Sequence, residues 1–182
     1  MQVQDAGSGA GWLSTARREP SPNCDERPVD ELVRLVVIHA ISLPPGEFGG
    51  PGIVQLFTNC LDPEAHPYFC DIRGLRVSAH FLVRRDGELI QLVSCSRRAW
   101  HAGVSNWRSQ ENCNNFSIGI ELEGCDELPF EDAQYLTLNC LLAELRRRYP
   151  IEAVVGHSDI APGRKTDPGP CFDWHRVHDA SS

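Results

Sequence analysis

One run of four apolar residues, Leu35-Val36-Val37-Ile38, restricts the fold of this chain more than any other feature of the sequence. Three of the four side chains are β-branched and no polar residue alternates with them, so the run predicts a strand that is buried on both faces. We expect this strand to end at His39. Together with the helical pattern described below, it predicts a single α/β domain with a central mixed sheet flanked by helices.

Further patterns predict the other elements of such a domain. Residues 81–85 and 88–93 predict the two strands of a hairpin, joined by the two-residue turn Asp86-Gly87. Residues 116–122 alternate in polarity and predict another strand. Residues 131–149 have the apolar spacing of the main helix, and the sequence predicts its apolar face. That face comprises Ala133, Leu136, Cys140 and Ala143, widened by Leu138, Leu141 and Leu145.

Two segments lack such periodicity. Residues 1–30 are polar and rich in proline and arginine, and we expect them to form a lead-in that lies across the main domain of residues 31–182. Residues 42–78 are rich in glycine and proline, and only residues 53–58 suggest a short helix. A long irregular segment inside a compact domain often forms the wall or lid of a binding site. Residues 154–157 predict a short strand or turn, and residues 172–178 a last helical turn.

The charge and the N-terminus exclude several classes of partner. The formal charge is −8, from 25 acidic and 17 basic residues, so we expect no binding to nucleic acid. The first ten residues have neither a basic start nor a long apolar run, which is unlike a secretory signal, and no stretch is apolar enough to span a membrane. We therefore expect a cytoplasmic protein, acting as a monomer.

The eight cysteines are spread over the whole chain and form no C-x-x-C pair. Zinc sites built from thiols usually have cysteines two to four residues apart, so cysteine is not the expected ligand here. Cys140, in the helical pattern, is expected to pack as a small apolar side chain. We expect all eight thiols to be free and reduced.

Two histidines and one aspartate could form a metal site. His39 directly follows the buried strand, His157 follows a glycine, and Asp167 lies in a loop rich in glycine and proline. Two neutral imidazoles and one carboxylate suit a catalytic zinc ion and leave a fourth position for water. Separations this long have no local pattern, so spacing alone leaves a structural role for His39 open.

Other residues compete for functional roles. His80 and His101 could each line a pocket or satisfy a backbone group in the core. Glu121 lies near the end of an apolar strand, where an unpaired carboxylate is costly to bury unless a cation or partial exposure relieves it; it could also face solvent. Lys165 could direct a cation toward Asp167 or lie on the loop surface.

Six blocks of unusual composition occur along the chain, at residues 37–39, 42–50, 77–82, 98–103, 115–124 and 165–170. In these blocks, and over about residues 11–173, the sequence resembles the AmpD-type 1,6-anhydro-N-acetylmuramyl-L-alanine amidases. The resemblance implies the fold of the wider superfamily, shared with phage lysozyme-type amidases and peptidoglycan recognition proteins: a mixed sheet flanked by helices, with a groove over the metal.

The resemblance also implies an activity and its residues. The expected reaction is hydrolysis of the amide bond between (1,6-anhydro)-N-acetylmuramic acid and the L-alanine of the stem peptide, in cytoplasmic recycling of cell-wall muropeptides. The substrate would be a small molecule, an anhydromuramyl-peptide. Zinc is expected on His39, His157 and Asp167, with Glu121 as general base and Lys165 stabilising the oxyanion. The expected substrate contacts are Arg76, Tyr68 and Trp100.

The sequence departs from the family at two positions. The asparagine that usually follows the first histidine ligand is Ala40, and the arginine that usually precedes Cys113 is Asn112. The first departure removes a polar group that resembles a substrate contact, and the second removes a cation expected near the substrate. Neither affects the expected metal ligands.

Three other functions are compatible with parts of the pattern. A recognition protein of the same fold would hold muropeptide without cutting it, and would be expected to lack a metal ligand. A secreted amidase acting on intact peptidoglycan would need an export signal, and unpaired cysteines suit an oxidising compartment poorly. A purely structural zinc protein would have a closed site of four ligands.

Overall fold

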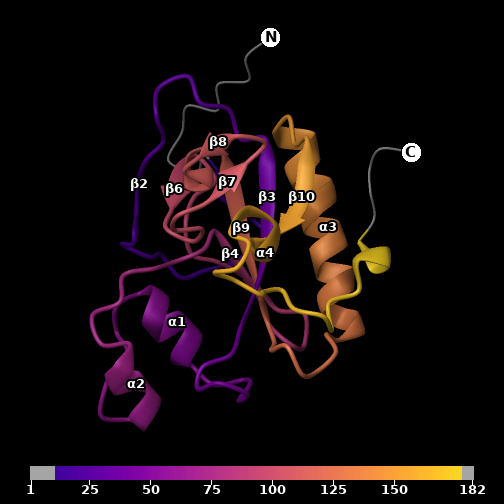
Figure 1. Cartoon of the computed structure of the whole chain (residues 1–182). Helices are drawn as coiled ribbons and strands as arrows, with labels where there is room; N and C mark the ends of the chain where they lie inside the picture. The colour runs from indigo at the N-terminus through magenta and orange to yellow at the C-terminus, as the bar shows by residue number, and fades with distance from the viewer. Residues whose placement is uncertain (1–10, 178–182) are drawn as a thin grey trace.

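The computed structural model describes residues 11–177 and has a six-stranded mixed sheet at its centre (Figure 1). The strand order is β1-β5-β4-β9-β3-β10; β4, β9, β3 and β10 are parallel, and β5 is antiparallel to β4. This confirms the predicted α/β class with a central mixed sheet. The six strands are β1 (Arg17–Arg18), β3 (Leu35–Ile41), β4 (Phe81–Val83), β5 (Leu89–Gln91), β9 (Ser117–Glu123) and β10 (Ala153–Gly156).

Within the described residues, two small antiparallel sheets and six helical segments complete the fold. One small sheet pairs β2 (Cys24–Glu26) with β6 (Arg97–Ala99), and the other pairs β7 (Asn106–Trp107) with β8 (Gln110–Glu111). The helical segments are α1 (Gly52–Phe57), α2 (Pro67–Asp71), η1 (Cys113–Asn115), α3 (Asp132–Arg148), α4 (His157–Ile160) and η2 (Trp174–Arg176).

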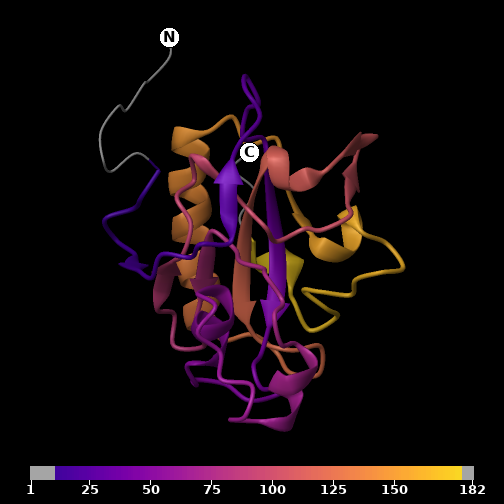
Figure 2. The same ribbon diagram turned by 90° about the vertical axis from the view of Figure 1, so that its left-hand side faces the viewer.

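Both faces of the central sheet are covered, as the apolar run in β3 requires. Val36 and Ile38 point to one face, where they share an apolar cluster with the leucines of α3. Leu35 and Val37 point to the opposite face and pack with Ile160 of α4. Figure 2 shows α3 on one side of the strands and α4 on the other. The side chains of β3 therefore alternate between two dry environments, which explains why the strand has no polar alternation.

The main helix lies within one residue of its predicted bounds at each end. The Gln134 side chain accepts a hydrogen bond from the Glu131 N–H at the start of the helix and donates to the carbonyls of Val83 and Glu123, which joins α3 to the sheet. The predicted apolar face was wrong in part, because Leu136 is 69% exposed and Cys140 is also exposed. The helix turns its larger apolar residues inward instead. These are Tyr135, Leu138, Leu141, Leu142 and Leu145.

One strand and one turn differ from the prediction. β3 continues two residues beyond His39, so this histidine lies inside a paired strand rather than at its end. The hairpin turn has three residues instead of two, because Arg84 pairs with Glu88 and the Gly87 N–H donates to the Arg84 carbonyl. Gly87 has a φ of 87°, the left-handed conformation that a bulged three-residue turn requires and that glycine adopts without strain.

The irregular segment after β3 lies beyond the carboxyl ends of β3 and β9, with α1 and α2 at the bottom of Figures 1 and 2. Gly49 in this segment donates its N–H to the buried Glu123 carboxylate, 2.7 Å away, and Arg84 forms an ion pair with the same carboxylate. Glu123 thus joins the segment to the end of the sheet.

Residues 11–30 contact the sheet at several points, while residues 1–10 of the expected lead-in lie outside the described residues. β1 pairs with β5 at the sheet edge. The Arg27 guanidinium is inserted between segments and donates to four backbone carbonyls. No carboxylate within residues 11–177 forms an ion pair with it, and burial lowers its pKa to about 10. These carbonyls belong to Cys95, Asn114, Asn115 and Ser117. The division at residue 30 stays a prediction.

All eight cysteines are free in the structure, as predicted. Within residues 11–177, none of the helices has the length and apolar character needed to cross a bilayer. The predicted last helical turn is present as η2, although His178 lies outside the described residues.

The Arg27 contacts generate a stability prediction. Arg27→Ala removes charge-assisted hydrogen bonds to four carbonyls and should lower the free energy of unfolding by roughly 3 kcal/mol. Arg73→Ala is the control, because Arg73 and its partner Glu64 are both exposed and such pairs contribute about 1 kcal/mol at most. Urea titration of both variants measures the midpoint at constant slope. Equal midpoints for the two variants would contradict a role of Arg27 in stability.

Candidate metal centre and its groove

The central sheet brings His39 and Glu121 side by side. The parallel register of β3 and β9 pairs these two residues directly, and register partners in neighbouring strands point to the same face. His157, the first residue of α4, follows the neighbouring strand β10. Asp167 comes from the loop after α4, which is joined to the helix by a bond from the Ser158 N–H to the Asp167 carbonyl.

Three donor atoms converge at this point. The Nδ1 atoms of His39 and His157 are 2.9 Å apart, and each lies 3.1 Å from the Asp167 Oδ2. The two histidines are 2% and 3% exposed. Burial lowers the pKa of His39 to about 4, although Asp167 opposes this shift.

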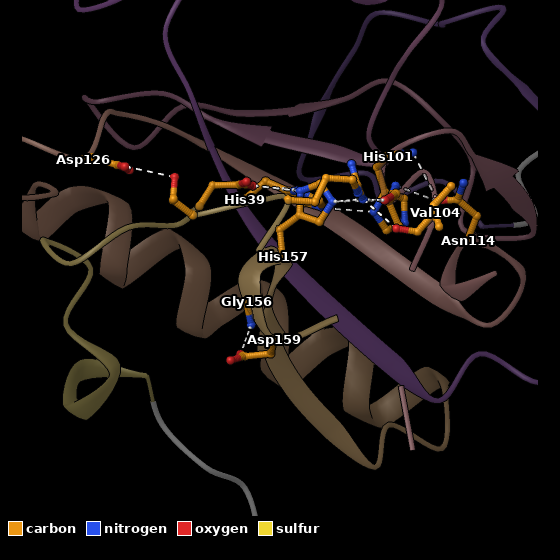
Figure 3. A network of polar contacts seen from close by, with 12 residues as sticks. His39, His101, Val104, Asn114, Asp126, Gly156, His157 and Asp159 are labelled. Carbon is orange, nitrogen blue, oxygen red and sulfur yellow. Dashed lines mark hydrogen bonds and ion pairs between the residues drawn. The ribbon is translucent and has the colours of Figure 1, made fainter. Parts of the chain in front are cut away.

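The Nε2 atoms of His39 and His157, on the side of each ring away from Asp167, also have partners. The His157 Nε2 donates to the Ala102 carbonyl at 3.0 Å, and the His39 Nε2 lies 2.9 Å from the His101 Nδ1. The Asn114 side-chain oxygen accepts from the backbone N–H groups of His101 and Ala102 and so holds this turn. Figure 3 shows the resulting network, with Asp126 at one end, His39 and His157 in the middle and Asn114 at the other end.

The loop that carries Asp167 is fixed from the opposite side. The Thr166 hydroxyl donates to the Asp126 carboxylate at 3.0 Å. Arg164 donates to the carbonyls of Ala102 and Val104 and thereby joins this loop to the turn beside His157. Asp167 is thus oriented by residues on both flanks.

The donor set fits a zinc ion. A carbonyl only accepts, so the neutral His157 carries its proton on Nε2 and directs an Nδ1 lone pair at the Asp167 carboxylate. Two acceptors 3.1 Å apart repel each other, and a cation between them relieves this repulsion. Tetrahedral zinc with nitrogen and oxygen ligands at about 2.1 Å separates neighbouring donors by about 3.4 Å, close to the observed triangle. His39, His157 and Asp167 also form a candidate metal-binding group within the described residues.

Glu121 is the buried acid of the site. Burial raises its pKa well above the usual value; the charge of Asp167 adds to this effect, and the charge of Lys165 opposes it. The Glu121 Oε2 is buried and has no hydrogen-bond partner. An unpaired carboxylate oxygen at this depth is costly, which is typical of a group that works on a bound molecule.

A groove of about 390 Å³ lies over these residues. Its floor contains the three donor residues and Glu121, and its walls come from the end of β3, from α1 and from the segment around α2. The irregular segment therefore forms a wall of the site, as predicted. The apolar part of the wall comprises Leu43, Leu56, Phe57, Ile72, Leu75 and Val77.

The predicted site residues differ in their placement. Lys165 and Tyr68 line the groove together with the donor residues and Glu121. Arg76 lines a smaller neighbouring hollow of about 110 Å³, and Trp100 is not among the described residues that line either cavity. Of the two departures from the family, Ala40 lines the groove, whereas Asn112 lines a separate pocket on the surface.

The two competing histidines, His80 and His101, have different roles in the structure. His80 is fully buried and structural: its Nδ1 accepts from the Gly119 N–H, and its Nε2 lies 3.0 Å from the Arg97 carbonyl. Burial lowers the pKa of His80 to about 3. His101 lines the groove and contacts the candidate ligand His39. Sequence reasoning missed Asn114, Arg164 and Asp126 as supports of the site. Asn114 and Arg164 act through backbone groups and Asp126 through the Thr166 hydroxyl, and none of these contacts has a sequence signal.

Comparisons with known proteins agree with this site. The profile of the family described as N-acetylmuramoyl-L-alanine amidase matches residues 28–170. The chain is 60% identical to the 1,6-anhydro-N-acetylmuramyl-L-alanine amidase AmpD of Escherichia coli K12, over 91% of this chain and 92% of that protein. The crystal structure of a selenomethionine derivative of AmpD, 60% identical, matches with a TM-score of 0.90 and covers 92% of this chain and 94% of that one. The E. coli amidase AmiD, in complex with anhydro-N-acetylmuramic acid-L-Ala-D-γ-Glu-L-Lys, matches with a TM-score of 0.60 at 28% identity, covering 85% of this chain and 64% of that one.

The charges around Glu121 predict that two substitutions shift its pKa in opposite directions. Lys165→Met removes the cation that opposes the shift and should raise the pKa of Glu121 further, whereas Asp167→Asn removes an anion and should lower it. Lys165→Arg keeps the cation and is the control. A carboxyl ¹³C NMR titration of the metal-free proteins measures all three. Shifts of the same sign in the first two variants would contradict the electrostatic coupling.

Proposed function

The chain belongs to the N-acetylmuramoyl-L-alanine amidase family, and from this premise we propose that it is a zinc-dependent hydrolase of anhydromuramyl-peptides. The proposed reaction cleaves the amide bond between (1,6-anhydro)-N-acetylmuramic acid and the L-alanine of the stem peptide, in recycling of cell-wall muropeptides. The observation that carries the proposal is the convergence of His39, His157 and Asp167 beside the unpartnered Glu121 carboxylate at the floor of one groove.

The names of the relatives support the substrate class. The 60% identical AmpD is named as a 1,6-anhydro-N-acetylmuramyl-L-alanine amidase, and the structure of AmiD holds an anhydromuramyl-peptide as substrate. A groove of about 390 Å³ has room for part of such a ligand. The groove combines apolar walls with a polar floor, which suits a molecule that has both sugar and peptide parts.

His39, His157 and Asp167 would hold the zinc ion. When bound, the ion supplies Lewis-acid polarisation of the scissile carbonyl and makes a water molecule acidic enough to lose a proton near neutral pH. Two contacts orient the ligand atoms toward the ion. The hydrogen bond of His157 to the Ala102 carbonyl leaves its Nδ1 as a lone pair, and the Thr166–Asp126 contact supports the loop that carries Asp167.

Glu121 is proposed to move the proton. Its Oε2 has no hydrogen-bond partner and Glu121 lines the groove next to His39, so this carboxylate can accept a proton from the attacking water and then donate it to the departing L-alanine nitrogen. A raised pKa suits both halves of this task, since a stronger base accepts the proton and the resulting acid still gives it up.

Lys165 is proposed to stabilise the oxyanion. It lines the same groove, and among the described residues its ammonium group has no hydrogen-bond or ion-pair partner. A cation near a developing negative charge contributes about 3–4 kcal/mol in comparable sites. Tyr68 is exposed by 40% in the groove wall and is proposed as a substrate contact. Contacts from Arg76 and Trp100 stay predictions.

Two alternatives are weaker. A recognition protein that only holds muropeptide has no need of a buried, unpartnered carboxylate beside the donor cluster. A structural zinc site would have a fourth protein ligand, and the candidate group within the described residues has three members.

The eight free cysteines support the proposed cytoplasmic setting, because oxidising compartments favour disulfides.

Metal content tests the proposed ligands. The purified chain should hold about one zinc ion, and His39→Ala, His157→Ala and Asp167→Ala should each lose it, because three protein ligands are the minimum for tight binding. His175→Ala, an exposed histidine in η2, should keep full content and serves as the control. Elemental analysis after dialysis measures all four variants. Full zinc content in the Asp167 variant would remove this residue from the ligand set.

Glu121→Gln tests proton transfer separately from metal binding. The amide keeps the shape of the side chain but cannot accept the proton, so kcat for release of peptide from anhydromuramyl-peptide should fall by about 10²–10⁴-fold. Zinc content should stay at the wild-type level, since Glu121 is not a ligand. Glu127→Gln, which changes an exposed acid, is the matched control. Wild-type turnover in the Glu121 variant would contradict its assignment as general base.

A further inference from the structure

A chain of hydrogen bonds leads away from His39 to a backbone carbonyl. The His39 Nε2 lies 2.9 Å from the His101 Nδ1, the His101 Nε2 lies 3.1 Å from the Ser117 Oγ, and the Ser117 Oγ lies 2.6 Å from the Cys113 carbonyl oxygen. His101 is held in place at its backbone by the Asn114 side chain, which Figure 3 shows beside it.

The carbonyl at the far end fixes the direction of every bond in this chain. A carbonyl only accepts, and a serine hydroxyl has one proton, so Ser117 donates to Cys113 and must accept from the His101 Nε2–H. The neutral His101 then has its lone pair on Nδ1 and accepts from the His39 Nε2–H. The remaining His39 nitrogen, Nδ1, is left as a lone pair directed at Asp167 and His157.

A protonated His101 would reverse this order. It would donate to both neighbours, so His39 would carry its proton on Nδ1, where the lone pair for a metal is needed. Neither hydrogen-bond partner of the His101 ring, Ser117 or His39, is an anion that could stabilise an imidazolium. A buried cation without an anionic partner is costly, and this cost favours the neutral ring.

The fold makes room for the histidine in the middle of the chain. A Cβ added at Gly119 of β9 would lie 2.5 Å from the His101 ring, so only glycine allows the ring to lie flat against this strand. Ser117 is two residues earlier on the same face of β9 and is fully buried. Gly119 and Ser117, which contact the His101 ring, therefore come from the strand that also carries Glu121.

We propose that Ser117 and His101 are positioning residues that hold His39 in the Nε2–H tautomer and so present its Nδ1 to the metal. The proposal rests on the proposed zinc site and deepens it. It also makes the two histidine ligands equivalent, since the relay from His39 and the direct bond from His157 both end at backbone carbonyls, those of Cys113 and Ala102. Such outer partners commonly change metal affinity by about 10–100-fold when they are removed.

Nitrogen-15 NMR of the histidine side chains tests the direction of the relay in the wild-type chain. In metal-free protein, and also after addition of zinc, His101 and His39 should both carry their single proton on Nε2. A His101 proton on Nδ1 would overturn the proposal. This measurement needs no variant, so it stands even if a substitution disturbs folding.

Ser117→Ala tests the consequence for metal binding. It removes one oxygen, and the Cys113 carbonyl keeps a partner in the Phe116 N–H. Zinc affinity, measured by competition with a chelator, should fall by about 10–100-fold, and His101 should show a mixture of tautomers. The control is Ser21→Ala, since the Ser21 hydroxyl also donates to a buried carbonyl, that of Phe57, and is not hydrogen-bonded to any of the histidines. Its affinity should stay within about twofold of wild type, because it has no contact with the relay.

The outcomes separate the relay from the proposed function. Tight zinc binding by the wild-type chain together with unchanged affinity in Ser117→Ala would overturn the relay and leave the zinc site intact. Absence of zinc binding by the wild-type chain would contradict the proposed function, and the tautomers of the metal-free protein would still decide the order of hydrogen bonds.

Discussion

The parallel pairing of β3 with β9 is the constraint on which the rest of the structure depends. Seven residue pairs, from Leu35–Ser117 to Ile41–Glu123, lie in register at the centre of the sheet. Odd-numbered positions of both strands face the same side, so one register places His39 beside Glu121, and Gly119 and Ser117 beneath His101. A slip by one residue would turn all of these side chains toward α3. The apolar residues that pack under α3 therefore fix the geometry of the polar site as well.

Burial of so many polar groups on one face needs compensation, and the site provides it in two ways. The outer nitrogens of the histidines are satisfied by hydrogen bonds that end at backbone carbonyls. The Nδ1 lone pairs of His39 and His157 converge on the Asp167 carboxylate, and no donor from the described residues lies between them. A zinc ion at this point would neutralise the negative charge. Among the buried side chains of residues 11–177, Glu121 is the one that keeps an unsatisfied oxygen. In this arrangement the residue without a partner is the one proposed to react.

The supports of the site come from distant parts of the chain. The turn around η1 contributes the Asn114 side chain and the Cys113 carbonyl, and Arg27, from the N-terminal segment, binds carbonyls of the same region. Loss of the Arg27 side chain would thus reach the metal site through the backbone that carries these groups and through His80, whose Nε2 lies 3.0 Å from the guanidinium. The apolar wall of the groove comes instead from the segment around α1 and α2, which Glu123 joins to the sheet. Metal geometry and groove shape depend on separate segments of the chain.

The sequence by itself determined the α/β class, the positions of the main strands and of α3, and the free state of the cysteines, because these follow from local periodicity and from residue spacing. Its resemblance to a family singled out His39, His157, Asp167, Glu121 and Lys165. Only the tertiary structure decided which face of α3 is buried, that the hairpin turn has three residues, and that His101 contacts a ligand while His80 is structural. The relay through Ser117 and the insertion of Arg27 also came from the structure alone. These features depend on pairing between residues far apart in the chain, Arg27 with Ser117 and His39 with His101, and such contacts arise from packing of the whole sheet rather than from any local pattern.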